Sequence, residues 1–271
     1  MTVKVVLAGC GNMGYAMLAG WLNSARLVPA EVAVVEPDEA LRDRAAKLGA
    51  TAVAGASDLA ADITPVLIIL AVKPQVINDV TAGYKRFAGT GATFLSVAAG
   101  TGIATFAAIL GDRTPIMRCM PNTPAAIGKG MMVLVDNGRV PAATIEFVKE
   151  LLSSSGRVAT IDDEGLMDAV TAVSGSGPAY IFHFIECLTA AGETAGLPRV
   201  TAKLLAMQTV YGAASLAAES DEEPGRLREQ VTSPNGTTAA ALKVLMGDDR
   251  LKKLVTEAVD AARVRGIELG K

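Results

Sequence analysis

A glycine-rich turn directly after a strand-like run is the feature that most constrains the fold of this chain. The run Val3–Ala8 leads into Gly9-Cys10-Gly11-Asn12-Met13-Gly14, and a helical stretch follows. In such a strand–turn–helix unit the first glycine permits a tight turn, the second lets the backbone approach a pyrophosphate, and the third allows close helix–strand packing. The helix N-terminus then offers free N–H groups to phosphate. A turn that binds nothing is the alternative. The predicted dinucleotide contacts are Gly9, Gly11, Asn12, Met13 and Gly14.

Short apolar runs alternate with helical stretches up to Ile161. Strands are expected at Val3–Ala8, Val32–Val35, Ala52–Ala54, Val66–Val72, Thr93–Ala98, Ile116–Met120, Met132–Val135 and Val158–Ile161. Several of these runs are apolar without alternation, which is typical of strands buried on both faces of a parallel sheet. Helical stretches such as Met13–Trp21 and Ile77–Phe87 lie between them. The pattern predicts an α/β fold, a Rossmann-type doubly wound sheet at the N-terminus.

The character of the chain changes after Ile161. The remainder is rich in Ala, Leu and Val, contains no convincing strand, and places prolines such as Pro178 and Pro224 where helices could begin. We therefore expect a dinucleotide-binding domain over 1–161 and an all-helical C-terminal domain over 162–271. Helices this rich in small apolar residues carry more apolar surface than one thin bundle hides, which favours a dimer.

The composition argues against several classes of protein. With 25 Lys and Arg against 28 Asp and Glu, the net charge of -3 lacks the basic surface that nucleic acid requires. The longest apolar run, Val66–Val72, is far shorter than the roughly 20 residues of a membrane helix. The N-terminus lacks the features of a signal peptide, and Cys10, Cys119 and Cys187 lack disulfide or metal spacing. With His183 as the lone histidine, we expect no metal site, no nucleic-acid or membrane partner, and a cytoplasmic location.

An acidic residue follows the second strand. Glu36 lies 22 positions after Gly14, where an acid normally binds the ribose hydroxyls and disfavours the 2′-phosphate of NADP. Arg42 and Arg44 lie in the next helix and could approach such a phosphate instead. A solvated charge at a strand end is the other interpretation of Glu36. The residues favour NADH slightly over NADPH.

Three further strand ends carry residues suited to a cofactor crevice, because the carboxyl ends of parallel strands line it. Lys73 could meet the nicotinamide ribose or a substrate carboxylate, and Asn122 could hydrogen-bond the nicotinamide amide. Small residues at the strand end between them would let a ring lie close to the backbone. Each turn is ordinary alone, but three at one sheet edge strengthen the interpretation. The predicted contacts are Val72, Lys73, Pro74, Ala98, Ala99, Gly100 and Asn122.

A second candidate site lies in the helical part. Leu227–Met246 contains a Pro-Asn-Gly turn, after which Thr237 and Thr238 open a helix. Two hydroxyls and free N–H groups at a helix N-terminus would suit a carboxylate. Taken alone, the segment is more typical of a threonine N-cap and a turn.

This segment, Thr232-Ser233-Pro234-Asn235-Gly236-Thr237-Thr238, resembles the signature of pyrroline-5-carboxylate reductases. The stretch Ser174–Tyr180 and the three strand ends Ala71–Pro74, Ala98–Gly100 and Met120–Pro124 also resemble that family, and the likeness spans residues 3 to 268. Asn235 stands where the family usually has glycine, and asparagine is the best non-glycine residue for a positive φ. The family often has histidine at position 223, which is glutamate here, and many members prefer NADPH, which Glu36 opposes.

The resemblance implies reduction of the cyclic imine Δ1-pyrroline-5-carboxylate to L-proline by NADH or NADPH. The substrate carboxylate would bind the N–H groups of Gly236, Thr237 and Thr238, with Ser233 beside them. Thr238 would be the catalytic residue, because its hydroxyl could hydrogen-bond the imine nitrogen and supply or relay its proton. An imine protonates easily, so no metal or covalent nucleophile is needed. The resemblance also implies a homodimer that assembles further.

Two other functions fit parts of the sequence. A β-hydroxyacid dehydrogenase also joins a Rossmann domain to helices, but it normally needs a lysine near the start of the helical domain. No lysine lies between Asp162 and Tyr180. A dinucleotide-binding redox sensor without turnover would explain the cofactor motif alone, but it leaves Thr237 and Thr238 without a role.

Overall fold

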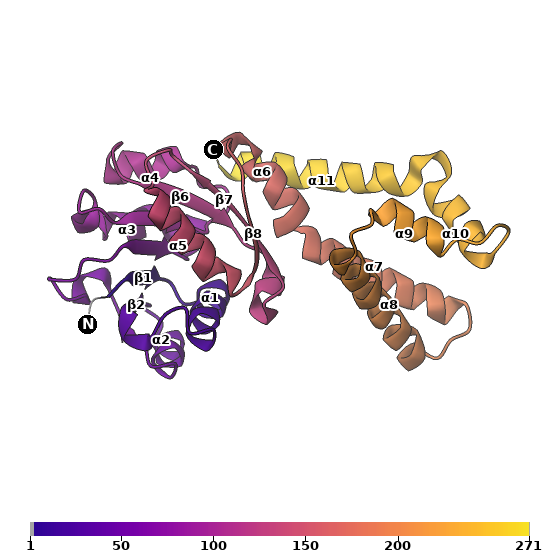
Figure 1. Ribbon diagram of the computed structural model, residues 1–271, viewed down its shortest axis with the longest axis horizontal. Coiled ribbons are helices and arrows are strands. Elements are labelled where there is room, and N and C mark those ends of the chain that lie inside the picture. The colour runs from indigo at the N-terminus through magenta and orange to yellow at the C-terminus, as the bar shows by residue number, and fades with distance from the viewer. Residues whose placement is uncertain (1–2, 271) are drawn as a thin grey trace. The chain divides into compact units, whose positions relative to one another are not determined.

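The computed structural model describes residues 3–270 and forms two compact units (Figure 1). One comprises Met1–Ser176 with Ala262–Lys271, and the other comprises Gly177–Ala261. The first contains an eight-stranded sheet with strand order β3-β2-β1-β4-β5-β6-β7-β8. The strands are β1 (Val5–Ala8), β2 (Val32–Val35), β3 (Thr51–Val53), β4 (Leu67–Leu70), β5 (Thr93–Ser96), β6 (Ile116–Met120), β7 (Gly130–Asp136) and β8 (Gly156–Thr160).

Each predicted strand forms, which confirms the α/β fold. Every neighbouring pair is parallel except β6 and β7, which are antiparallel. The chain crosses from β3 at one edge back to β4, so the strand order reverses beside β1. In open α/β sheets, ligands bind at such a switch point, outside the carboxyl ends of the strands.

Successive side chains along a strand pack on opposite faces of the sheet. Val5 and Leu7 of β1 pack into one core, whereas Val6 and Ala8 pack into another. Because both faces are covered, the central strands are fully buried, which explains their continuous apolar runs. Helices of this unit are α1 (Asn12–Asn23), α2 (Glu39–Ala46), α3 (Ile77–Ala82), α4 (Ile103–Leu110), α5 (Ala142–Ser153) and α6 (Met167–Val170).

One expected helix is shorter than its pattern indicates. The apolar spacing predicts a helix over Ile77–Phe87, but α3 ends at Ala82 and a 3₁₀ turn follows at Lys85–Phe87. Gly83 and Tyr84 separate the two, and the Tyr84 side chain is buried in the core. The break therefore turns an aromatic ring inward that a continuous helix would have directed elsewhere.

Over its described residues the second unit consists of helices joined by turns and contains no strand, as the sequence predicts. Its helices are α7 (Gly177–Thr194), α8 (Arg199–Glu219), α9 (Pro224–Gln230), α10 (Thr237–Met246) and the first part of α11 (Arg250–Leu269). Gly192 lets α7 approach α8 closely, since a β-carbon there would lie 3.1 Å from the Ala202 β-carbon. None of the helices in residues 3–270 is both long and apolar enough to span a bilayer.

Large apolar side chains of the helical unit are exposed. They include Phe182, Phe184, Val200, Leu204, Tyr211 and Leu254. Only Ala202 and Ala206 of α8 are buried among the described residues of its helices. Exposed apolar surface of this extent is characteristic of a protein interface.

Candidate active site

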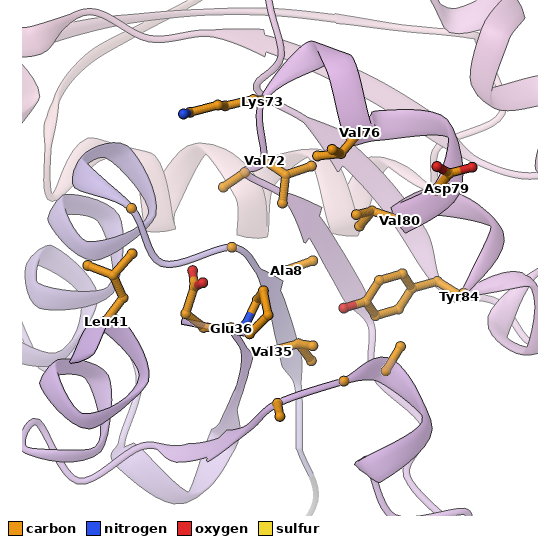
Figure 2. Close-up of a pocket in the computed structure, with 18 residues that line it drawn as sticks. Ala8, Val35, Glu36, Leu41, Val72, Lys73, Val76, Asp79, Val80 and Tyr84 are labelled. Atoms are coloured by element: carbon orange, nitrogen blue, oxygen red, sulfur yellow. The ribbon is translucent and has the colours of Figure 1, made fainter. Parts of the chain in front are cut away.

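A cleft of about 620 Å³ opens beyond the carboxyl ends of β1, β2 and β4 (Figure 2). Its position matches the switch point of the sheet. Of the predicted cofactor contacts, five line the cleft, and all belong to the first unit. These are Gly9, Gly11, Glu36, Val72 and Lys73.

The three motif glycines occupy three different environments. Gly9 has a φ of +91°, and a β-carbon there would lie 2.6 Å from the Ala71 carbonyl oxygen. A β-carbon on Gly14 would lie 2.2 Å from the Gly9 oxygen, so α1 packs directly on the turn. A β-carbon on Gly11 would meet no atom of residues 3–270 within 4 Å. Gly11 therefore faces the open cleft, as expected of the glycine that a pyrophosphate approaches.

The start of α1 offers backbone donors at this point. Its N-cap is Gly11, and no side chain in the described part of the chain caps the helix. Asn12 and Met13 occupy the first two helical positions, which leave their N–H groups without intrahelical partners. This end of the helix suits an anion.

Glu36 is 6% exposed and holds the glycine turn. Its Oε2 accepts a hydrogen bond from the Cys10 N–H at 2.6 Å, and its Oε1 accepts one from the Asp38 N–H at 3.1 Å. Figure 2 shows this carboxylate pointing toward the glycine turn from the end of β2. A negative charge thus lies at the place where the sequence predicts the cofactor ribose.

The two nearby arginines are already bonded to backbone carbonyls. Arg42 Nη1 donates to the Glu36 and Pro37 oxygens at 2.9 Å each. Arg44 Nη2 donates to the Cys10 oxygen at 2.9 Å, and its guanidinium lies 4.0 Å from the centre of the Tyr15 ring. Neither guanidinium is therefore aimed into the cleft for a phosphate.

Cys10 contributes no nucleophile to the cleft. Burial raises the pKa of its thiol to about 11, although Arg44 lowers it and Glu36 adds to the rise. The thiol is therefore protonated at neutral pH, and only a thiolate would be an effective nucleophile. Among residues 3–270, no group of three or more His, Cys, Asp or Glu side chains could hold a metal ion.

The remaining predicted cofactor contacts do not line this cleft. They are Asn12, Met13, Gly14, Pro74, Ala98, Ala99, Gly100 and Asn122. The Asn122 side chain is used within the fold, because its Oδ1 accepts from the Met131 N–H at 2.8 Å and its Nδ2 donates to the Ser174 oxygen at 3.2 Å. Gly100 has a φ of +72° and packs against Leu269 near the end of α11.

Several cleft residues are not among those expected from the sequence. These include Pro37, Leu41, Val76, Asp79, Val80 and Tyr84. They come from the segment after β2 and from α3 with its flanking turns. These residues form no recognisable motif. Only their position after the strands beside the switch point could have indicated that they line the cleft.

The turn before α10 has the geometry that its sequence suggests. Asn235 adopts a φ of +60°, so asparagine does support the left-handed turn. A β-carbon on Gly236 would meet Ser233 Oγ, so a larger residue at this position would displace the Ser233 hydroxyl. The N-cap of α10 is Gly236 rather than a threonine, and none of the described side chains caps the helix. Thr237 and the half-buried Thr238 then occupy the first turn, with Ser233 beside it.

Both parts of the chain match families of known proteins. Residues 164–269, which include the whole helical unit, match the family of pyrroline-5-carboxylate reductase dimerisation domains, which supports a homo-oligomer. Residues 4–100 match the family described as coenzyme F420-dependent NADP oxidoreductase.

Curated relatives extend the match to the whole chain. A pyrroline-5-carboxylate reductase of Pseudomonas aeruginosa is 40% identical over 271 residues, covering 100% of this chain and 98% of that protein. One from Synechocystis is 40% identical and covers 100% of both chains.

Solved structures agree. The pyrroline-5-carboxylate reductase of Coxiella burnetii superposes with a TM-score of 0.93 at 33% identity, covering 100% of both chains. The Plasmodium falciparum pyrroline carboxylate reductase, solved with NADP bound, superposes with a TM-score of 0.85 at 29% identity, covering 99% of this chain and 98% of that one. These full-length matches show that this chain belongs to the pyrroline-5-carboxylate reductase family of NAD(P)H-dependent oxidoreductases.

Proposed function

We propose that this protein reduces Δ1-pyrroline-5-carboxylate to L-proline, with NADH or NADPH as the hydride donor. The observation that carries the proposal is the 40% identity to named reductases over the full chain. The cleft supports it, because the open face of Gly11 and the uncapped start of α1 suit a pyrophosphate. The reaction belongs to the biosynthesis of proline.

For this reaction the protein needs only to bind the imine and the cofactor, to orient them, and to supply one proton. When bound, the reduced nicotinamide supplies a hydride to the imine carbon. The glycine turn would hold the dinucleotide through Gly9, Gly11, Asn12, Met13 and Gly14. Glu36 would hold its ribose. Val72 and Lys73 border the same cleft. The protein thereby limits the freedom of two reactants, which is a large part of the rate enhancement.

The start of α10 would bind the imine. Backbone N–H groups of Gly236, Thr237 and Thr238 would bind its carboxylate, with Ser233 adding a hydroxyl. Within residues 3–270 no side chain caps this helix, so the N–H groups of Thr237 and Thr238 have no competing cap, whereas the Gly236 N–H donates to the Ser233 carbonyl oxygen at 3.1 Å. The Thr238 hydroxyl would donate a hydrogen bond to the imine nitrogen and supply or relay its proton.

We assign the dinucleotide to a domain over 1–161, and dimerisation and substrate binding to a helical domain over 162–271. The protein would be a cytoplasmic homodimer that assembles further, with each active site shared between two chains. Exposed apolar side chains on α7 and α8, such as Phe182 and Leu204, support a tight interface.

Mixing two defective chains tests the shared site. Gly11→Asp should block cofactor binding, and Thr238→Ala should slow catalysis. If each site combines the cleft of one chain with Thr238 of its partner, half of the dimers after exchange are mixed, and each mixed dimer has one intact site. About a quarter of wild-type activity should then return. Activity no higher than the sum of the two parents, after exchange is demonstrated by mass spectrometry, would place each site within one chain.

Glu36 should make the enzyme prefer NADH. A 2′-phosphate would approach a carboxylate, while Arg42 and Arg44 already hold backbone oxygens. Even at an effective dielectric constant of 20, like charges about 4 Å apart repel by about 4 kcal/mol, so a tenfold preference is a conservative expectation. Glu36→Ser should raise the NADPH-to-NADH ratio of kcat/KM about tenfold or more. Steady-state kinetics with both cofactors measures this, and Asp79→Ser, at the other end of the cleft, is the control. A wild-type enzyme that strongly prefers NADPH would contradict the assignment.

The proposed reaction is tested by turnover. Purified protein should oxidise NADH or NADPH only when Δ1-pyrroline-5-carboxylate is present, and one L-proline should form for each cofactor oxidised. Cofactor binding without turnover would indicate the non-catalytic sensor instead. Turnover of β-hydroxyacids but not of the imine would indicate the dehydrogenase.

A further inference from the structure

Tyr84 places a hydroxyl at the cofactor cleft. The residue is 1% exposed, and its ring stacks on Phe87 with centroids 6.4 Å apart. It also lines the cleft, and Figure 2 shows the ring reaching from the end of α3 toward Val35 with its hydroxyl leading. Within the described part of the chain, this hydroxyl has no hydrogen-bond partner.

An unpartnered hydroxyl at this depth is unusual. Buried polar groups are nearly always hydrogen-bonded, and leaving one without a partner is costly. Phenylalanine would fill the same space without that cost. Burial raises the pKa of Tyr84, so the side chain is a neutral phenol that can both donate and accept a hydrogen bond.

The position of Tyr84 indicates which part of a dinucleotide it would meet. The pyrophosphate belongs at Gly11, and the adjoining ribose belongs at Glu36. The next group along the molecule is the adenine. The cleft wall formed by the end of β3 and by α3 is mostly apolar, with Ala54, Val76 and Val80 among its side chains. This is a suitable surface for a flat heteroaromatic ring.

Building on the proposed function, we propose that the Tyr84 hydroxyl hydrogen-bonds the adenine of the cofactor and so contributes to cofactor affinity. Adenine has ring nitrogens that accept and an amino group that donates, and a phenol hydroxyl complements either. Because NADH and NADPH share the adenine, Tyr84 strengthens the binding of both equally. Its role is therefore distinct from that of Glu36, which discriminates between them.

Tyr84→Phe tests the contact, because it removes the hydroxyl and keeps the ring packed on Phe87. Loss of one hydrogen bond between neutral groups should raise the Kd for both NADH and NADPH about fivefold, as measured by titration of cofactor fluorescence. Reduced nicotinamide mononucleotide lacks the adenosine. The ratio of kcat/KM for NADH to that for the mononucleotide should therefore fall about fivefold.

Thr93→Val is the matched control. Among the residues that the structure describes, the buried Thr93 hydroxyl in β5 also has no hydrogen-bond partner, but Thr93 does not line the cleft. Its removal should leave both Kd values unchanged. An unchanged NADH Kd in Tyr84→Phe, or an equal loss with the mononucleotide, would overturn the adenine contact. Failure of the wild-type protein to bind either dinucleotide would overturn the proposed function as well.

Discussion

Replacing Thr238 with alanine is expected to lower kcat about 100-fold, because one positioned proton donor typically contributes at least that factor. The substitution removes the hydroxyl but keeps the backbone N–H that would bind the carboxylate. Thr238 is also not the N-cap of α10, so the change should cost little helix stability. Stopped-flow measurement of single-turnover NADH oxidation would isolate the chemical step.

Thr238→Ser provides the control, since it restores a hydroxyl at the same position. It should recover most of the lost rate, while the Kd for NADH stays at the wild-type value in both variants. Normal turnover by Thr238→Ala would show that the hydroxyl takes no part in the reaction. An alanine variant that serine does not rescue would point to loss of packing instead.

The second large effect is expected at Gly11. A β-carbon there meets nothing within 4 Å, so Gly11→Asp should fold normally. The new carboxylate would face the pyrophosphate, and like charges about 4 Å apart repel by about 4 kcal/mol at an effective dielectric constant of 20. Cofactor affinity should therefore fall about 100-fold or more, as measured by calorimetric titration with NADH.

Gly11→Ala separates charge from size at the same position. Its methyl group enters open space, so NADH affinity should fall much less than in Gly11→Asp. Both variants should melt near the wild-type temperature without cofactor. Equal losses in the two would mean that backbone approach rather than charge sets the affinity, and an unaffected Gly11→Asp would place the pyrophosphate elsewhere.

The sequence predicts features formed by neighbouring residues better than features formed by residues that are distant in sequence. The three glycines and Asn235 act through their own backbone and immediate neighbours, so the motif spacing is enough to anticipate their geometry. The central strands β1, β2 and β4 were predictable for a related reason, because burial on both faces requires continuous apolar runs.

Features that depend on long-range packing could not be predicted in this way. Asn122 has the residue type of a cofactor contact, but its amide bonds Met131 and Ser174, and Ser174 is distant in sequence. Tyr84 lies within a pattern that predicts one continuous helix. Only the break after α3 turns its ring into the core and its hydroxyl toward the cleft.

The most direct test of the central claim follows the hydride itself. Turnover of Δ1-pyrroline-5-carboxylate with NADH deuterated at C4 of the nicotinamide, on the face from which it is transferred, should yield L-proline with one deuterium at its δ-carbon, the former imine carbon. Proton NMR and mass spectrometry of the product would detect it, with each C4 epimer of the labelled cofactor tested in turn. Proline that carries no deuterium with either epimer, or an imine that stays unreduced while the cofactor is bound, would contradict the account.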